Sequence, residues 1–580
     1  MLDYKREYER WLASDVLNAD EKAELQAIAG DEKEIESRFY GPLEFGTAGL
    51  RGTMKVGLHQ MNVHVIRWAT QGFADVIAAE GDEAKQKGVA ICMDCRVNSM
   101  AFARAAAEVC AANGIRVRIF ESLRPTPELS FAVRYYGCQA GINVTASHNP
   151  KEYNGYKVYW EDGAQFTPPH DKGVTEEVMA ITDLSTVKTM GAQEAKAKGL
   201  YEIIGAAIDD KYIAQVKAQV VNQGAIDRMQ DQITIVYTPL HGTGNIPARR
   251  VMKELGFTHV YVVPQQELPD GDFPTVSYPN PEAKEAFELG LALAKKKNAD
   301  LVLATDPDAD RLGVYVKDTK SGEYIPLTGN MSGSLLCEYV LSQKQANGKI
   351  PADGQVVKSI VTTNLVDAVA KNYGAELIEV LTGFKWIGKQ VLKNEQEGKG
   401  TYLFGMEESY GCLIGTYARD KDAISATAAL CEAAAYYKEK GMTLWDAMVE
   451  MYEKYGYYKD EVKSIGLKGI EGLAKIQEIM EYFRAHTPSD FAGHKVLAVR
   501  DYKADTVKDL ATGEVKPTGL PSSNVLYYEL EDNAWLCVRP SGTEPKIKFY
   551  YGVKGTSLED AAAKSEKVGE SVMAIVNGLL

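Results

Sequence analysis

Three stretches of the chain repeat one order of elements: an apolar strand-like run, a helix, a second run, a helix, and a third run that ends in a polar cluster. The third runs cover residues 141–146, 300–305 and 401–405. Strands that alternate with helices are typical of largely parallel sheets covered by helices. In such sheets, ligand groups gather beyond the carboxyl ends of the strands. The repeat therefore predicts related α/β domains with functional side chains directly after these runs.

The pattern changes after about residue 455, where a polar helical stretch precedes several short strand-like runs and a helix at residues 558–577. Strands grouped without intervening helices favour a smaller α+β domain. The chain has 580 residues, more than one hydrophobic core usually serves. We therefore predict an α/β fold of three related domains with mixed, largely parallel sheets, followed by a C-terminal α+β domain. The predicted boundaries are 1–207, 208–324, 325–456 and 457–580.

The charge balance argues against a polyanionic partner. Lys and Arg number 65 and Asp and Glu number 80, which gives a formal charge of −15. Nucleic-acid binding usually needs a basic surface, whereas one phosphate needs only a local cluster of cations. Eight dispersed cysteines, a charged start and the lack of a long apolar run predict a cytoplasmic protein that binds neither membrane nor nucleic acid.

Three carboxylates, Asp306, Asp308 and Asp310, directly follow the second of these runs. Hard oxygen ligands at this density suit Mg²⁺ or Mn²⁺. A calcium-binding EF-hand would need Gly and Glu where this chain has Arg311 and Lys317. Solvated acids at the start of a helix are the alternative interpretation.

Ser147 follows the first run and precedes His148, Asn149 and Pro150. A serine at this place can simply cap a helix. The nucleophile elbow of α/β-hydrolases would need glycines two residues to either side, and the chain lacks them. Together with a divalent metal, the better hypothesis is a hydroxyl that accepts and returns a phosphoryl group. His148 and Lys157 are then the candidates for proton transfer.

Three further segments offer ligand groups. A turn at residues 539–545 combines Arg539, two hydroxyls and a glycine, which suits a phosphate, although a plain surface turn is the alternative. Glu407 and Ser409 can bind vicinal hydroxyls. A glycine-rich loop near the N-terminus carries Arg51. No Gly-Lys pair is followed by Ser or Thr, so the chain has no Walker A motif.

Four motifs occur in the order TASHNP, DPDADR, MEES and RPSGTEP, and together they resemble the α-D-phosphohexomutase superfamily, which includes phosphoglucomutases and phosphomannomutases. The segments TGFKWIG, EESYG and ARDKDA are similar to the long phosphoglucomutase and phosphopentomutase branch. The resemblance implies three related α/β domains and a C-terminal domain like TATA-binding protein. Met406 is a departure, since many members have Gly before this Glu.

The resemblance also implies roles for individual residues. Ser147 would be the phosphoserine, and one Mg²⁺ would be bound by Ser147, Asp306, Asp308 and Asp310. Ser147, His148, Lys157 and Arg51 would be catalytic. The implied substrate contacts are Arg311, Lys385, Glu407, Ser409, Arg419, Arg539, Ser541, Gly542 and Thr543. In order, the four domains would supply the phosphoserine, the metal site, sugar recognition and phosphate binding.

The implied reaction interconverts glucose 1-phosphate and glucose 6-phosphate through glucose 1,6-bisphosphate. Phosphopentomutase or phosphomannomutase activity with the same mechanism is the alternative. A Mg²⁺-dependent sugar phosphatase and a non-catalytic sugar-phosphate sensor are alternatives of other classes. The expected partners are small sugar phosphates, and the expected assembly is a monomer or a homodimer.

Overall fold

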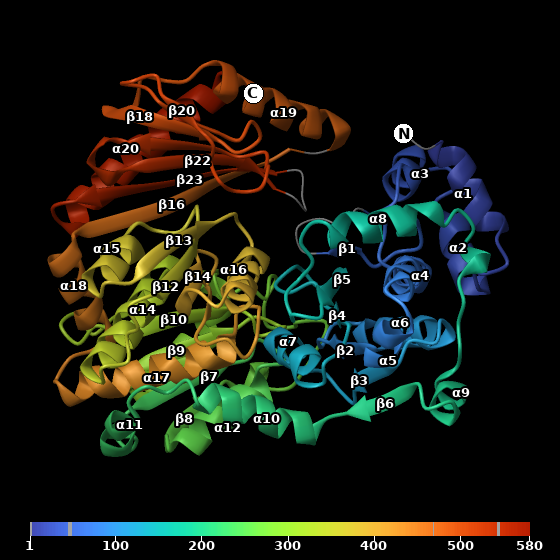
Figure 1. The fold of residues 1–580 in the computed structure, drawn as a ribbon, viewed down its shortest axis with the longest axis horizontal. Coiled ribbons are helices and arrows are strands. Elements are labelled where there is room, and N and C mark those ends of the chain that lie inside the picture. Colours follow the sequence, from blue (N-terminus) through green and yellow to red (C-terminus); the bar gives the residue numbers. More distant parts are fainter. Residues whose placement is uncertain (1–2, 44–48, 468, 542–545) are drawn as a thin grey trace. The chain divides into compact units, whose positions relative to one another are not determined.

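The structure is a computed structural model that describes residues 3–43, 49–467, 469–541 and 546–580 (Figure 1). The chain forms two compact units. The first unit comprises Met1–Leu327, Phe384–Gly398 and Tyr410–Gly441. The second comprises Thr328–Gly383, Lys399–Ser409 and Met442–Leu580. Within the described residues, no helix is both long enough and apolar enough to cross a membrane.

The first sheet of the first unit has the strand order β1-β5-β4-β2-β3-β6. Its strands are β1 (Leu50–Thr53), β2 (Val89–Met93), β3 (Val117–Phe120), β4 (Ala140–Val144), β5 (Tyr153–Trp160) and β6 (Tyr201–Ile204). Strands β4, β2, β3 and β6 are parallel, and β5 runs antiparallel to β4 and to β1. Every residue of β2 and β4 is buried, because helices cover both faces.

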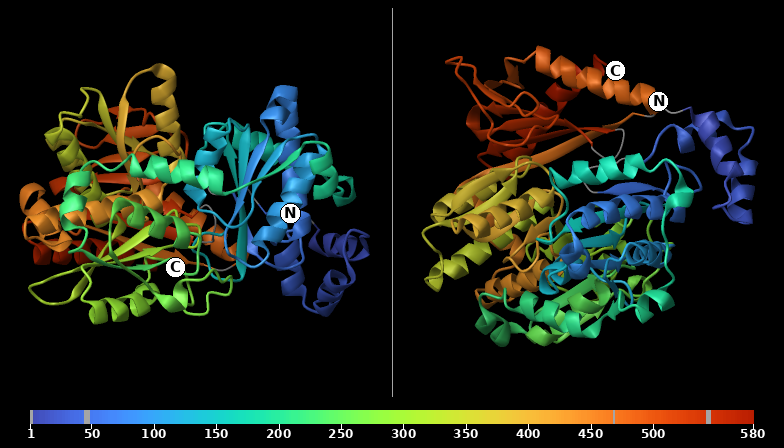
Figure 2. Two further views of the ribbon diagram at one scale, coloured as in Figure 1. Left: turned by 90° about the horizontal axis from the view of Figure 1, so that it is seen from below. Right: turned by 45° about the vertical axis from the view of Figure 1, so that its right-hand side comes forward.

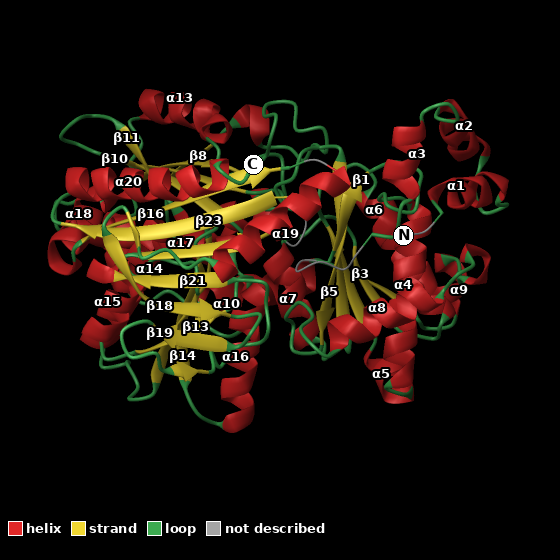
Figure 3. Cartoon of the chain, turned by 90° about the horizontal axis from the view of Figure 1, so that it is seen from above, coloured by secondary structure: helices red, strands yellow, loops and turns green. Residues whose placement is uncertain are grey.

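The helices that cover this sheet lie in two layers. Figure 3 shows α7 (Thr126–Tyr135) on one face, with α6 (Ser99–Ala112) and α4 (Val63–Ala79) on the other. Helix α8 (His170–Ala180) packs on α4. The remaining helices of this region are α1 (Tyr4–Ala13), α2 (Ala19–Ala27), α3 (Glu32–Phe39), α5 (Asp82–Lys87) and α9 (Ala192–Ala197).

The second sheet has the order β11-β10-β9-β7-β8. Its strands are β7 (Thr234–Thr238), β8 (His259–Val262), β9 (Leu301–Thr305), β10 (Leu312–Lys317) and β11 (Tyr324–Leu327). Strand β7 is parallel to β8 and β9, whereas β10 is antiparallel to its neighbours. Its helices are α10 (Ala206–Lys217), α11 (Gln223–Met229), α12 (Asn245–Leu255) and α13 (Glu288–Lys297). The alanine-rich helix α17 (Ala423–Glu439) packs on α11 and α12. Helix α16 (Phe384–Glu397) and strand β15 (Gly411–Leu413) also belong to the first unit.

In the second unit, β12 (Gly354–Ser359) pairs in parallel with both β13 (Glu376–Val380) and β14 (Thr401–Glu407). Helices α14 (Gly329–Ala346), α15 (Leu365–Asn372) and α18 (Leu444–Tyr455) pack beside them.

The C-terminal sheet of the same unit is antiparallel, with the order β16-β23-β22-β21-β18-β19-β20, and β17 pairs with β18. Helices α19 (Gly469–Ala485) and α20 (Leu558–Asn577) pack on it (Figure 2). Its strands are β16 (Tyr457–Gly466), β17 (Asp490–Phe491), β18 (His494–Asp501), β19 (Thr506–Asp509), β20 (Val515–Lys516), β21 (Leu526–Leu530), β22 (Trp535–Pro540) and β23 (Lys546–Gly555).

The predicted fold class is confirmed, and the predicted helix at 558–577 is observed as α20. The predictions missed β5 and β16. Strand β5 carries polar and glycine residues between its aromatic ones, so it lacks a continuous apolar run. Strand β16 is strongly charged, which is typical of a strand that lies at the edge of a sheet. The domain boundaries stay predictions.

Candidate active site

Two loops that follow buried parallel strands meet in the first unit. Ser147 lies just after β4, and Asp306 directly follows β9. The Ser147 Oγ donates a hydrogen bond to Asp306 Oδ2 over 2.7 Å, although the two residues are 159 positions apart. Ser147 is only 2% exposed. The sequence repeat predicted functional groups at these strand ends, and the structure brings the first two clusters together.

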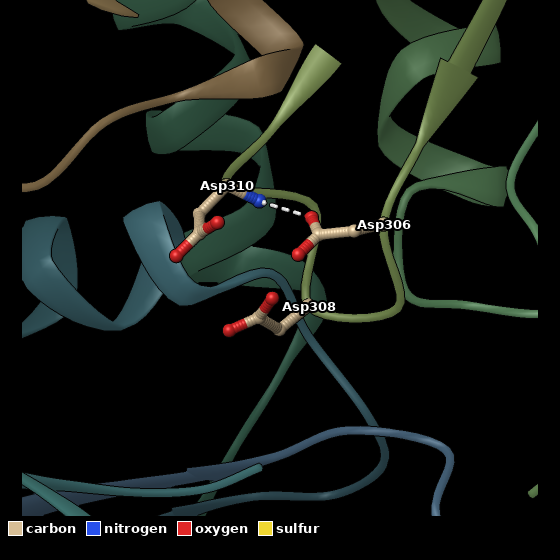
Figure 4. Close-up of side chains that lie close together, drawn as sticks. All are labelled: Asp306, Asp308 and Asp310. Atoms are coloured by element: carbon tan, nitrogen blue, oxygen red, sulfur yellow. Dashed lines mark hydrogen bonds between the residues drawn. The ribbon is translucent and has the colours of Figure 1, made fainter. Parts of the chain in front are cut away.

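The carboxylates of Asp306, Asp308 and Asp310 form one buried cluster (Figure 4). One oxygen from each lies within 4.8 Å of the others. The backbone N–H of Asp310 donates to Asp306 Oδ1 over 3.1 Å, which closes the loop. Two buried oxygens, Asp308 Oδ1 and Asp310 Oδ1, accept no hydrogen bond from any residue that the structure describes. Buried acceptors without donors are costly, and a divalent cation with hard oxygen ligands would satisfy them.

Two lysines approach this cluster. Lys157, at the centre of β5, places its Nζ 2.8 Å from Asp308 Oδ2 and 3.6 Å from Asp310 Oδ2. Lys421 places its Nζ 3.0 Å from Asp310 Oδ2. The sequence predictions did not include Lys421, although the ARDKDA segment that contains it was noted as a family feature. The alternation of charges in that segment was the available signal.

The cluster holds its carboxyl groups in different electrostatic states. Burial and the charges of Asp308 and Asp310 raise the pKa of Asp306 well above its usual range. Burial also opposes ionisation of Asp308, but the ammonium of Lys157 and several hydrogen bonds outweigh it and lower the pKa of Asp308. Thr126 makes one of these bonds, from its Oγ1 to Asp308 Oδ2 over 2.7 Å. Thr126 is a second residue that the sequence predictions missed.

Ser147 has a left-handed backbone, with φ at +51°. This region is strained for a residue with a Cβ and persists only where the surroundings impose it. The buried guanidinium of Arg96 stabilises it here, because it donates to the carbonyl of Ser147 itself and to carbonyls of the loop that follows. Arg96 donates to the carbonyl oxygens of Ser147 (2.6 Å), Asn149, Pro150 (2.9 Å) and Tyr153 (3.0 Å).

A second layer of contacts fixes Arg96 itself. The Arg96 Nε lies 3.3 Å from Asp94 Oδ2, and both side chains are fully buried. The Thr145 Oγ1 donates to the same oxygen over 2.7 Å and accepts the backbone N–H of Ser147 over 2.8 Å. We infer that Arg96 is a positioning residue for Ser147. No sequence motif marked it, because its partners are mostly backbone carbonyls.

Replacing Arg96 with Met should therefore weaken both the fold and the reaction. We expect the free energy of unfolding of the first unit to fall by about 3 kcal/mol, since the buried carboxylate of Asp94 would lose its charged partner. At temperatures where the variant is fully folded, we expect kcat to fall about tenfold or more with little change in KM, because Ser147 loses its orientation. Calorimetry and steady-state kinetics measure the two effects. Arg104→Met, at an exposed position of α6, is the matched control, and an unchanged kcat in Arg96→Met would contradict the assignment.

His148, Arg51 and Arg311 surround the same loop. The His148 Nδ1 lies 3.1 Å from Ser147 Oγ. Burial lowers the pKa of His148 well below its usual range, and the charges of Arg311 and Arg51 lower it further. The Arg51 Nη1 donates to Asn149 Oδ1 over 2.8 Å, and the Arg311 Nη1 donates to Glu282 Oε1 over 2.7 Å.

The second unit holds the predicted groups for sugar hydroxyls and for the second phosphate. Glu407 ends β14 and is buried, and Ser409 follows it. Glu408 lies between them. Burial and the charge of Glu407 raise the pKa of Glu408 to about 7, although the charges of Lys548 and Arg539 oppose this shift. Arg539 thus lies close enough to the Glu407–Ser409 turn to act on it. Ser541 is placed by its backbone N–H, which donates to the Lys546 carbonyl over 2.7 Å. Gly542 and Thr543 lie outside the described residues.

Two further predicted substrate contacts, Arg419 and Lys385, have other neighbours in the structure, and their roles stay predictions. Arg419 is fully buried, and its guanidinium contacts Glu395 and the backbone carbonyls of Thr416 and Ala418. These contacts hold the loop that presents Lys421. Lys385 lines a separate cleft of the first unit.

Comparisons with known proteins agree with this fold. Residues 42–185, 210–322 and 328–455 match the models of α/β/α domains I, II and III of phosphoglucomutase/phosphomannomutase. A phosphoglucomutase of Staphylococcus saprophyticus is 34% identical over 535 residues, which cover 92% of this chain and 95% of that protein. The chain belongs to the phosphoglucomutase/phosphomannomutase family, which is part of the α-D-phosphohexomutase superfamily. It is therefore a phosphohexomutase enzyme.

Two solved structures share the fold. A putative phosphomannomutase from Thermus thermophilus superposes with a TM-score of 0.65 at 21% identity, covering 91% of this chain and 99% of that one. Parafusin, a phosphoglucomutase of Paramecium, gives a TM-score of 0.66 at 18% identity, covering 92% of this chain and 96% of that one.

Proposed function

We propose that this enzyme interconverts glucose 1-phosphate and glucose 6-phosphate through a phosphoserine at Ser147. The observation that carries the proposal is the hydrogen bond of 2.7 Å between Ser147 Oγ and a buried cluster of three carboxylates. A hydroxyl beside a candidate metal site suits transfer of a phosphoryl group rather than binding alone. The phosphoglucomutase of S. saprophyticus supports glucose as the sugar.

The reaction has two transfers. In the first, the bond between Ser147 Oγ and phosphorus breaks, a bond forms to O6 of glucose 1-phosphate, and the O6 proton passes to a base. The product is glucose 1,6-bisphosphate, which turns end for end. In the second, its O1–phosphorus bond breaks, the phosphoryl returns to Ser147, and O1 takes up a proton. His148 and Lys157 are the proposed proton carriers, because His148 lies beside the Ser147 hydroxyl and Lys157 beside the carboxylate of Asp308.

We propose Mg²⁺, one per chain, at Asp306, Asp308 and Asp310 together with the Ser147 oxygen. The two buried carboxylate oxygens that lack donors among the described residues fit such an ion. When bound, Mg²⁺ supplies positive charge that offsets the charge of the transferred phosphoryl group. Arg51 and Arg311 would add charge on the side of His148, since both lower its pKa.

For the rest of the substrate, we propose that Glu407 and Ser409 bind sugar hydroxyls. Arg539, Ser541, Gly542 and Thr543 would bind the phosphate that is not transferred, as an arginine fork and hydroxyls suit a phosphate. Glucose 1,6-bisphosphate would also serve as the activator that first loads Ser147. A cytoplasmic location is supported by the cysteines, all eight of which are free thiols. Monomer and homodimer, and the absence of nucleic-acid partners, stay predictions.

Coupled assays with several sugar phosphates test the choice of sugar. We expect kcat/KM for glucose 1-phosphate to exceed that for mannose 1-phosphate and ribose 1-phosphate by about tenfold or more, a difference that contacts to one hydroxyl can provide. A higher value for ribose 1-phosphate would favour a phosphopentomutase. Release of inorganic phosphate in step with substrate loss would instead indicate a phosphatase.

A further inference from the structure

A second cleft of about 640 Å³ lies in the first unit. Its size is that of a site for a small molecule. Among its lining residues are Lys87, Arg134, Trp160, Lys385 and Lys389, and we call it the basic cleft. None of the four family motifs accounts for a ligand there.

The basic cleft lies at the opposite edge of the first sheet from Ser147. It is lined by Gly137 and Cys138, which precede β4, and by Trp160, which pairs with Ala140 at the start of β4. Ser147 comes after the other end of the same strand. The length of β4 therefore separates this end of the basic cleft from the transferring hydroxyl.

Cations outnumber acids in the lining, where only Glu161 and Asp162 are acidic among the described residues. Glu161 is already engaged, since its Oε2 lies 3.5 Å from Lys87 Nζ. Lys385 and Lys389 are one turn apart on α16, a spacing at which like charges face each other and repel. Neither forms an ion pair with another residue in the part of the chain that the structure describes. The lining thus carries a local excess of positive charge on a chain whose formal charge is −15.

Burial makes that excess costly. Burial lowers the pKa of Lys385. The charge of Asp171 opposes this shift, and the charge of Lys389 adds to it. Burial likewise lowers the pKa of Arg134, which lies beside Arg419. The Arg134 Nη1 donates to the backbone carbonyl of Asp162 over 3.0 Å, and its Nη2 lies 3.7 Å from the exposed side of Glu395. Partly buried cations with incomplete compensation are stabilised when an anion binds between them.

The geometry points to the basic cleft as a second anion site, which binds a small phosphorylated molecule through Arg134, Lys385 and Lys389. A guanidinium and two ammonium groups together suit a phosphate ligand better than they suit a ligand with a single carboxylate. Trp160 forms an aromatic wall beside them, with His170 stacked on it at 4.6 Å. Of its three proposed ligands, only Lys385 is also a substrate contact that the family resemblance implies, and Arg134 and Lys389 have no part in the proposed phosphoryl transfer.

Calorimetric titration of the full chain with pyrophosphate tests the proposal. We expect the double variant Lys385→Gln/Lys389→Gln to bind pyrophosphate at one class of sites about tenfold or more weakly than wild type. Hydrogen bonds to charged groups are among the strong ones, and the variant loses two charged donors. Lys393→Gln, an exposed position of the same helix outside the lining, is the matched control and should bind as wild type. Arg539→Gln should leave this class of sites in place, which separates it from the proposed substrate phosphate site.

Location is measured separately with crystals soaked in tungstate, whose anomalous signal marks a bound anion. We expect a peak between Arg134 and Lys385, absent in the double variant. Arg134→Gln provides a second test if the double variant has a lowered melting temperature. Pyrophosphate binding by Lys385→Gln/Lys389→Gln that equals wild type, or tungstate only near Ser147 and Arg539, would overturn the proposal.

Discussion

Ser147→Ala should abolish sugar-phosphate interconversion and leave the fold intact. We expect kcat to fall by about 10⁵-fold or more, the scale of loss when a covalent nucleophile is removed. Among the described residues, the Ser147 hydroxyl contacts Asp306 and His148. Arg96 donates to backbone carbonyls of the loop, so these hydrogen bonds remain in the variant. A coupled assay for glucose 6-phosphate measures the loss, and thermal melting measures the fold.

The matched control is Ser185→Ala, at an exposed position in a short helical turn. It should keep wild-type activity. A Ser147→Ala variant with more than a few per cent of wild-type activity would contradict the covalent mechanism. Thr126, a second hydroxyl at the carboxylate cluster, already donates to Asp308 and accepts a hydrogen bond from Asn143.

Removal of divalent metal should have the second largest effect. We expect dialysis against a chelator to lower kcat about 10³-fold or more, and Mg²⁺ to restore it, because the charge of the transferred phosphoryl group would lose its main counter-charge. Mn²⁺ binding followed by electron paramagnetic resonance gives a readout that does not depend on activity.

Asp308→Asn should reproduce this loss without rescue by Mg²⁺. The substitution removes charge from a carboxylate that Lys157 and Thr126 hold in place, so metal affinity should fall while the side chain keeps its size. Glu323→Gln, an exposed acid of the same unit, should bind Mn²⁺ as wild type does. Full activity of the chelator-treated enzyme, or Mn²⁺ binding unaffected by Asp308→Asn, would contradict the metal site.

Much of this site could be predicted because it depends on strand ends. Strands β4 and β9 are buried at every position and largely apolar, and the polar residues that follow each mark where Ser147 and Asp306 stand. The two strands belong to different sheets, and in each sheet ligand groups gather beyond the carboxyl ends of the strands. This physical rule, together with the family motifs, was enough to select the serine and the three carboxylates.

The parts that were missed depend on long-range contacts that leave little local signal. Arg96 acts through backbone carbonyls, which any sequence provides. Lys421 meets Asp310 only because α17 and the loop before it return to the second sheet. Lys385 and Arg419 come from the family resemblance, and their roles as substrate contacts stay predictions, since Lys385 lines the basic cleft and Arg419 contacts its own loop.

The phosphorylation state of Ser147 tests the central claim most directly. After incubation with glucose 1,6-bisphosphate, intact-mass spectrometry and peptide mapping should find one phosphoryl group per chain, located on Ser147, and glucose 1-phosphate should remove it in a single turnover. A chain that turns over substrate with Ser147 unmodified throughout, or a phosphoryl group on another residue, would contradict the account.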